Sequence, residues 1–175
     1  MKYDSSGVFT TLDASKTDGD CEILGTTGYP WTPGTYQAFA YVEVEVSTAL
    51  SGRKLKVGFS GCLSYKIWAG IWGDADIFVR VSLMSSRETE LDTHQVWTKH
   101  VDGSWAGESE SGSIAPWVYS TTYKMDEEFT LQPNQTYYAA VLLLVYLDSN
   151  AYCRSSSGND ATYLDVSRIS WSFYT

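Results

Sequence analysis

The most apolar stretch of the chain is residues 136–147, where nearly every side chain is hydrophobic and several are β-branched or aromatic. Turn-forming residues bound it on both sides, at 131–135 and at 148–150. An uninterrupted apolar run of this kind fits either a strand buried on both faces or a buried helix. Tyr137 and Tyr138 favour the strand, because aromatic residues are enriched in sheets. We therefore expect residues 136–147 to form a central strand.

Other stretches alternate strictly between apolar and polar residues, which is the pattern of a strand with one face in solvent. In residues 38–47, for example, Val42 and Val44 alternate with Glu43 and Glu45. Similar alternation is found in residues 54–60, 62–72, 77–84 and 162–174 and, more weakly, in residues 94–101. Residues 114–123 are expected to be extended but not central, because Pro116 cannot donate to a sheet ladder.

No segment keeps a helical period for more than two turns. The pattern therefore predicts an all-β protein, an antiparallel two-sheet β-sandwich with the jelly roll as the leading topology. An immunoglobulin-like sandwich is the alternative, although the Cys–Trp–Cys spacing of antibody-type domains is absent.

The 175 residues fit one domain. Residues 1–37 are rich in turn-forming and polar types, and we expect an irregular N-terminal arm there with one short strand at 8–12. Residues 38–175 are expected to form a single β-sandwich domain.

Charge and hydropathy exclude several classes of protein. The net charge of −9 argues against nucleic-acid binding, which needs a positive field. No run of apolar residues is long enough to cross a membrane as a helix. The first residues lack the apolar core of a signal peptide, so the product is expected in the cytoplasm or in a virion.

Motifs for catalysis are absent. His94 and His100 would lie about 20 Å apart along one strand and could not share a metal through it. Neither a nucleophile elbow nor a His-Glu-x-x-His motif is present, so we predict that the protein is not an enzyme. Cys21, Cys62 and Cys153 lack zinc-site spacing and are expected to be small apolar core residues, with one long-range disulfide as the alternative.

Acidic residues cluster in several predicted loops. None of these clusters matches the calcium-binding loop of an EF-hand, and Asp is also a common turn residue. We therefore expect no cofactor. If calcium is bound, Asp18 and Asp20 are the best candidates for its ligands.

Aromatic residues are the most suggestive feature, with seven Trp and thirteen Tyr in the chain. Trp68 and Trp72 are four apart in a predicted strand, so they could line one face over about 13 Å, or they could fill a buried face. Trp105 lies in a polar segment where burial is not expected, which favours a contact role. Trp97 and Trp117 fall near the same loop-rich edge and complete the candidate ligand-binding set.

Residues 129–138, Phe-Thr-Leu-Gln-Pro-Asn-Gln-Thr-Tyr-Tyr, resemble the entry to a late core strand in many β-sandwich modules. These include carbohydrate-binding modules and the jelly-roll domains of phage and viral structural proteins. The resemblance implies a β-sandwich architecture and transfers no functional residue.

Two functional hypotheses follow from these patterns. The first is a non-enzymatic structural or binding protein, namely a capsid-decoration, tail or receptor-binding component of a phage or virus. It would assemble as a homo-oligomer or with other virion subunits, and the aromatic residues Tyr29, Trp31 and Tyr36 of the N-terminal arm favour such contacts. The alternative is a carbohydrate-binding module that binds glycan on its aromatic side chains.

Overall fold

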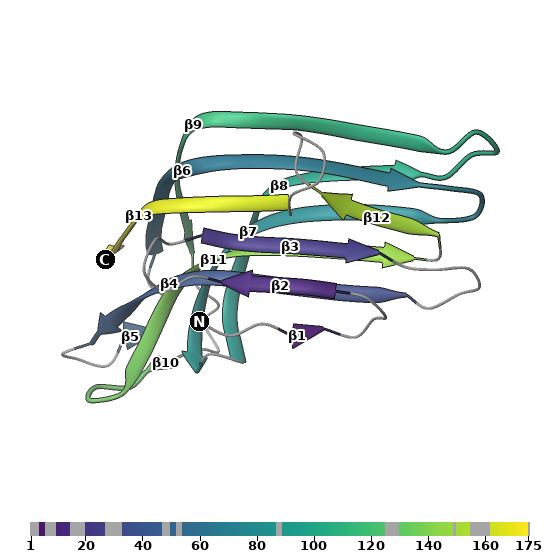
Figure 1. Ribbon diagram of the computed structural model, residues 1–175. Helices are drawn as coiled ribbons and strands as arrows, with labels where there is room; N and C mark the ends of the chain where they lie inside the picture. The colour runs from purple at the N-terminus through teal and green to yellow at the C-terminus, as the bar shows by residue number, and fades with distance from the viewer. Residues whose placement is uncertain are drawn as a thin grey trace.

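The structure is a computed structural model of the chain. It describes residues 4–5, 10–14, 20–26, 33–46, 50–51, 54–86, 89–124, 130–148, 150–154 and 162–174. All regular structure in these residues is β-strand (Figure 1). The part of the chain so described therefore contains no helix that could cross a membrane.

The strands, in chain order, are β1 (Asp4–Ser5), β2 (Thr10–Ala14), β3 (Asp20–Thr26), β4 (Gly34–Glu45), β5 (Leu50–Ser51), β6 (Lys54–Ala69), β7 (Asp74–Ser86), β8 (Thr89–Asp102), β9 (Glu108–Lys124), β10 (Thr130–Leu131), β11 (Thr136–Asp148), β12 (Ala151–Arg154) and β13 (Thr162–Tyr174).

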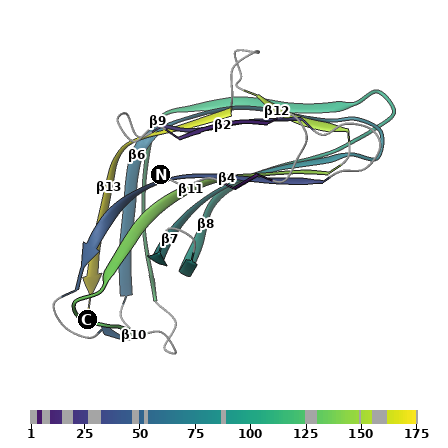
Figure 2. The same cartoon turned by 60° about the horizontal axis from the view of Figure 1, so that its bottom comes forward.

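Two antiparallel sheets face each other. One has the order β1-β4-β11-β7-β8, and the other has the order β12-β3-β13-β6-β9 with β2 added beside β3. A small two-stranded pairing joins β10 and β5. Figure 2 shows the two layers and shows that the long strands bend in the same direction near the C-terminal end of β13.

The order in which the long strands pair identifies the topology. Of the described strands, the eight that have seven residues or more are, in chain order, β3, β4, β6, β7, β8, β9, β11 and β13. The first pairs with the last, the second with the seventh, the third with the sixth and the fourth with the fifth. This nesting is that of a long hairpin rolled into two sheets, which is the jelly roll. The predicted all-β sandwich and its leading topology are confirmed, and the immunoglobulin-like alternative is not adopted.

Strand β11 lies at the centre of its sheet, with β4 on one side and β7 on the other. Leu143 and Val145 are fully buried in the main core between the sheets. Leu142, which points to the opposite face, is also fully buried in a separate cluster with Phe39. The apolar run at 136–147 is therefore a strand buried on both faces, as its composition predicted.

Residues 1–37 contain more strand than the sequence predicts. Strand β3 is hydrogen-bonded to β12 and β13, β2 pairs with β3, and β4 begins at Gly34. Two of the three partners of β3, namely β12 and β13, lie more than a hundred residues away in the chain, so the local pattern carries no sign of them. The division into an arm and a domain remains a prediction.

Two of the three cysteines have described side chains. Cys153 is buried in the main core, Cys62 is half-buried, and both are thiols. For these two residues the structure agrees with a packing role; the side chain of Cys21 lies outside the described residues.

Removing a core side chain tests the role of β11. We expect Leu143→Ala to lower the free energy of unfolding by about 2–5 kcal/mol, because it leaves a cavity between the sheets. Urea denaturation measures the change. The control is Val118→Ala, at a side chain that is 77% exposed, which should change stability by no more than about 0.5 kcal/mol. Equal effects of the two substitutions would contradict this picture of the core.

Candidate functional site

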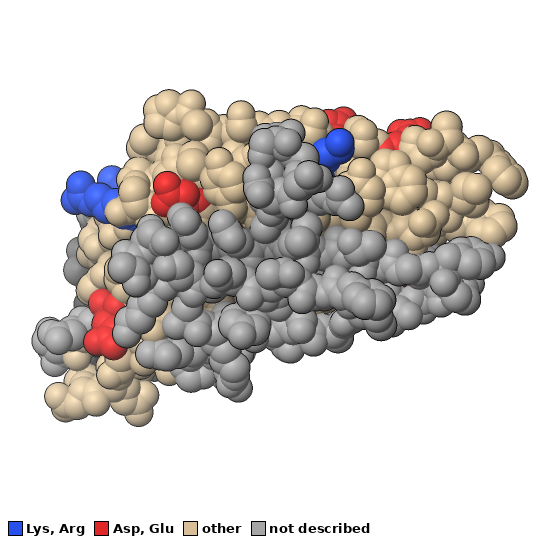
Figure 3. Space-filling model, viewed as in Figure 1, with Lys and Arg blue, Asp and Glu red and all other residues tan. Residues whose placement is uncertain are grey.

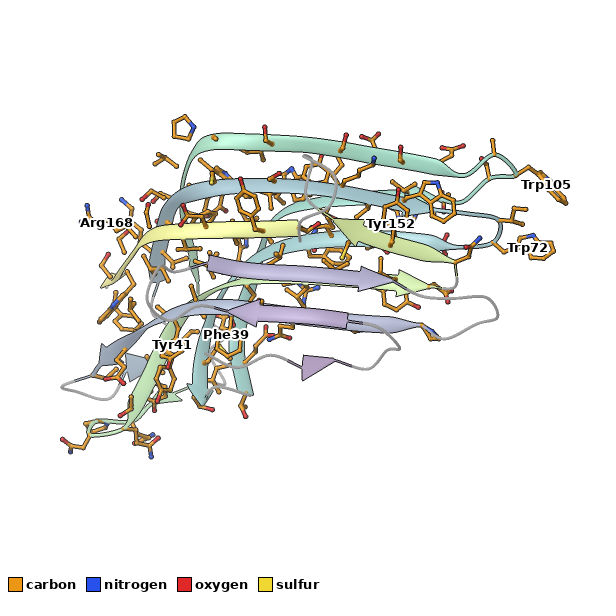
Figure 4. All side chains as sticks on the ribbon, viewed as in Figure 1. Phe39, Tyr41, Trp72, Trp105, Tyr152 and Arg168 are labelled. Carbon is orange, nitrogen blue, oxygen red and sulfur yellow. The ribbon has the colours of Figure 1, made fainter. Side chains whose placement is uncertain are left out.

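Two tryptophans stand out of the surface at one end of the sandwich. Among the described residues the exposed large hydrophobic side chains are Trp72, Trp105 and Val118, and the two indoles are 63% and 84% exposed. Their ring centroids are 6.5 Å apart and their planes are tilted by 59°. Figure 4 shows both side chains projecting from the turns at this end, and on the face that Figure 3 shows, the described residues at the tip itself are uncharged.

The turn that carries Trp72 connects β6 to β7. The amide of Gly73 donates to the carbonyl of Gly70 over 2.9 Å, which closes a four-residue turn with Trp72 in its third position. Trp72 has a φ of 59°, as a type II turn requires at this position, where Gly is the favoured residue. A bulky side chain in this region costs about 1–2 kcal/mol. Such strain is concentrated at functional sites.

The turn that carries Trp105 connects β8 to β9 and is tied to the first turn through the backbone. Within it, the amide of Gly107 donates to the carbonyl of Ser104 over 2.9 Å. Between the turns, the amide of Gly103 donates to the carbonyl of Gly73 over 2.7 Å. The contact is so close that a Cβ at Gly103 would lie 1.7 Å from the carbonyl oxygen of Gly70. Both indoles are thus carried by one hydrogen-bonded backbone frame.

Trp68 is half-buried and packs against this frame. Its ring stacks on that of Tyr152, with centroids 5.3 Å apart and planes 15° apart. Gly107 lies over the same indole, so close that a Cβ there would be 2.6 Å from Nε1 of Trp68. The predicted alignment of Trp68 and Trp72 requires a continuous strand, but β6 ends at Ala69. The structure pairs Trp72 with Trp105 instead.

Trp97 and Trp117 are half-buried and pack against the main core. Their rings are 6.4 Å apart in an edge-to-face arrangement, Trp97 contacts Tyr65 at 5.0 Å, and Trp117 contacts Phe59 at 5.1 Å. Of the five predicted tryptophans, Trp68, Trp97 and Trp117 are thus half-buried and in contact with other rings, whereas Trp72 and Trp105 form the exposed pair.

The candidate calcium ligands are not placed by the structure. Asp18 lies outside the described residues, and Asp20 begins β3, with a side chain that is likewise not described. No group of three or more His, Cys, Asp or Glu residues suited to a metal occurs within the described part of the chain. The calcium alternative stays a prediction.

A row of carboxylates crosses the sheet just below the two turns. Asp74 of β7 lies opposite Asp102 of β8 on one side and opposite Asp148 of β11 on the other. Burial is the main cause that raises the pKa of Asp74, and the charges of Asp102 and Asp148 raise it further, whereas His100 lowers it. The smaller contributions of Asp102 and Asp148 come from negative charge close to Asp74 at this end of the sheet.

Two residues further along the same strands, the side chain of His100 bridges two of the carboxylates. His100 Nδ1 lies 2.8 Å from an oxygen of Asp76, and Nε2 lies 2.9 Å from an oxygen of Asp102. Both hydrogen bonds favour the protonated ring and raise the pKa of His100, Asp102 contributing most. Tyr146 of β11 lies opposite Asp76, and burial together with the neighbouring carboxylates raises its pKa.

Sequence reasoning identified the exposed tryptophans but missed the groups around them. The Asp74–Asp102 pairing depends on the register of β7 and β8, and the Trp68–Tyr152 stack depends on the register of β6 and β12. The one available signal was that acidic residues flank both Gly-rich turns, at Asp74 and Asp102.

Comparison with known proteins gives weak structural matches only. No family model and no curated protein matches the sequence. A solved structure described as "CBM4 structure and function" matches with 13% identity and a TM-score of 0.30, over 97% of this chain and 94% of that one. The Clostridium thermocellum N-terminal endo-1,4-beta-D-xylanase 10B, solved as its CBM22-1 and GH10 modules with xylohexaose, matches with 14% identity and a TM-score of 0.25.

The second match covers 90% of this chain but only 27% of the xylanase chain. The protein thus has a weak structural similarity to carbohydrate-binding modules, and neither matched structure is described as a virion protein.

Separating the two turns should weaken the fold locally. We expect Gly103→Ala to lower the free energy of unfolding by about 1–3 kcal/mol, because the new methyl group would meet backbone atoms of Gly70 and Gly73. Urea denaturation followed by tryptophan fluorescence checks this. The control is Ser111→Ala, at an exposed position of β9. A Gly103→Ala variant as stable as the control would contradict the close approach.

The hydrogen bonds of His100 predict a pH dependence of stability. The ordinary pKa of the ring is 6.5, and it is raised in the folded protein. The stabilisation by His100 is therefore fully present below about pH 6.5 and is lost as the pH rises through the folded-state pKa. The difference in unfolding free energy between the wild type and His100→Asn should shrink across this range. A difference that is constant or that grows with pH would exclude the charged His100 bridge.

Proposed function

We propose that the protein binds carbohydrate without catalysis, through the exposed pair Trp72 and Trp105. The observation that carries this proposal is that two indoles, 63% and 84% exposed, lie together at one end of the sandwich. Exposed aromatic groups of this kind mark contact surfaces, since leaving them in water is unfavourable.

The chemistry of the indoles suits a sugar. The C–H face of a pyranose packs on the face of an aromatic ring, and the adjacent hydroxyl groups remain free to bond with water or polar side chains. Because the planes of Trp72 and Trp105 are tilted by 59°, they form two walls at an angle and not one flat surface. Such a site suits a short stretch of glycan that contacts both walls.

The backbone frame supports the proposal through its rigidity. The turns are linked by the Gly103–Gly73 hydrogen bond, and the first turn is also held by a 2.9 Å hydrogen bond from the amide of Gly70 to the carbonyl of Asn150. When the backbone of a binding site is already ordered, less conformational entropy is lost on ligand binding. The positive φ of Trp72 also agrees with a contact role, because strained backbone conformations cluster at functional sites.

The virion role and the oligomeric assembly stay predictions from the sequence. The exposed pair favours glycan binding, because its two rings present a small area, whereas a stable subunit interface buries a large one.

Substitution of either tryptophan tests the proposal. We expect Trp72→Ala and Trp105→Ala each to weaken glycan binding about tenfold, equivalent to about 1.4 kcal/mol, because each removes one wall of the site. A glycan array and affinity electrophoresis in soluble polysaccharides identify the ligand, and calorimetry gives its dissociation constant. Product analysis in the same mixtures should find no cleavage.

The matched control is Val118→Ala, which trims another exposed hydrophobic side chain, on β9. It should bind as the wild type does. Absence of retention by any glycan, or equal binding by the wild type and both tryptophan variants, would refute the proposed function.

A further inference from the structure

The exposed pair Trp72 and Trp105 is bordered by negative charge. Asp74 follows Trp72 by two residues, and Asp102 precedes Trp105 by three, so the turns that carry the indoles also carry carboxylates at their bases. Three residues of extended chain span at most about 11 Å. The Cα atoms of each carboxylate residue and of the tryptophan in the same turn are therefore no more than about 11 Å apart.

The carboxylates lie on one face of the sheet. Asp74 and Asp76 alternate with the buried Ala75, so both point away from the core. Asp102 and His100 lie opposite them on β8, and the side chain of Asp102 is 82% exposed. The face that borders the turns is thus built of acidic groups bridged by one histidine. We call the carboxylates of Asp74, Asp76, Asp102 and Asp148 the acidic border.

The groups that face this border from the neighbouring strands do not reverse its sign. Strand β11 contributes Asp148 and Tyr146, and beyond it Thr35 of β4 lies opposite Tyr146. Of the described groups whose charge acts on Asp74, His100 is the one that lowers its pKa, while Asp102 and Asp148 raise it.

Carboxylates placed opposite each other on neighbouring strands repel and reduce stability. A bound cation would relieve that repulsion, and aromatic faces also attract cations through their negative π-electron density. The aromatic pair and the acidic border therefore favour the same kind of ligand, one with a flat apolar face and a positive charge.

We propose that the glycan bound by Trp72 and Trp105 carries protonated amino groups, as in oligosaccharides of glucosamine. The indoles contact the apolar face of the sugar, and Asp102 together with Asp74 faces the ammonium groups. This inference rests on the proposed function and narrows its ligand to cationic glycans.

The experiment compares two oligosaccharides of equal length and linkage whose nitrogen atoms are either protonated amines or uncharged acetamides. Binding of the wild-type protein is measured by calorimetry at mildly acidic pH with a β-1,4-linked oligomer of glucosamine and with its fully N-acetylated counterpart of the same length. We expect the charged oligomer to bind about fivefold tighter, as one exposed ion pair allows. The preference should fall as salt is added, because exposed charges are screened.

Variants assign the preference to the acidic border. Asp102→Asn should reduce the preference for the charged oligomer about two- to fivefold, and Asp74→Asn is a second variant with the same expected direction. Glu43→Gln, which removes one exposed carboxylate from β4, is the matched control and should keep the full preference. The salt titration of the wild type provides a test that is independent of any variant.

The outcomes separate this inference from the proposed function. Equal binding of both oligomers, with loss of binding in Trp72→Ala, would overturn the cationic ligand and leave glycan binding intact. Failure of the wild type to bind these or any other glycan would overturn both. Competition by polylysine as strong as that by the glucosamine oligomer, and equal in Trp72→Ala, would reduce the effect to general charge attraction and overturn the inference.

Discussion

The hydrogen-bonded ladder of β11 with β4 and β7 is the interaction on which the rest of the molecule depends. Strand β11 is paired along nearly its full length on both edges, and its side chains are buried on both faces. A strand satisfied in this way has no solvent-exposed backbone and fixes the register of its neighbours, because a slip by one residue would move every buried side chain to the other face. The remaining strands are added around it in nested pairs.

That nesting also brings two turns together at one end of the sandwich. In the rolled hairpin most connections cross from one sheet to the other, and the turns from β6 to β7 and from β8 to β9 cross at the same end. These two turns carry the exposed side chains of Trp72 and Trp105. Close backbone contacts at Gly70 and Gly103 hold these turns together.

The sequence anticipated much of the fold because its strands are long and strongly patterned. Pro116 pointed to a non-central strand, and β9 is indeed the edge of its sheet. The strands between residues 10 and 26 were largely missed, because they are short and depend on partners such as β13 near the other end of the chain. Residues 108–113 are polar and Gly-containing and nevertheless form the start of β9, since an edge strand can be polar on both faces.

The sequence by itself determined that the protein is an all-β sandwich, that residues 136–147 lie at its centre and that Trp105 is exposed, because each depends on local composition alone. Only the tertiary structure decided which residue accompanies Trp105. Spacing along the chain placed Trp72 beside Trp68, whereas a turn with a positive φ directs it to the other loop. The acidic border is likewise a product of register, since Asp74, Asp102 and Asp148 come from three strands that only the folded sheet brings together.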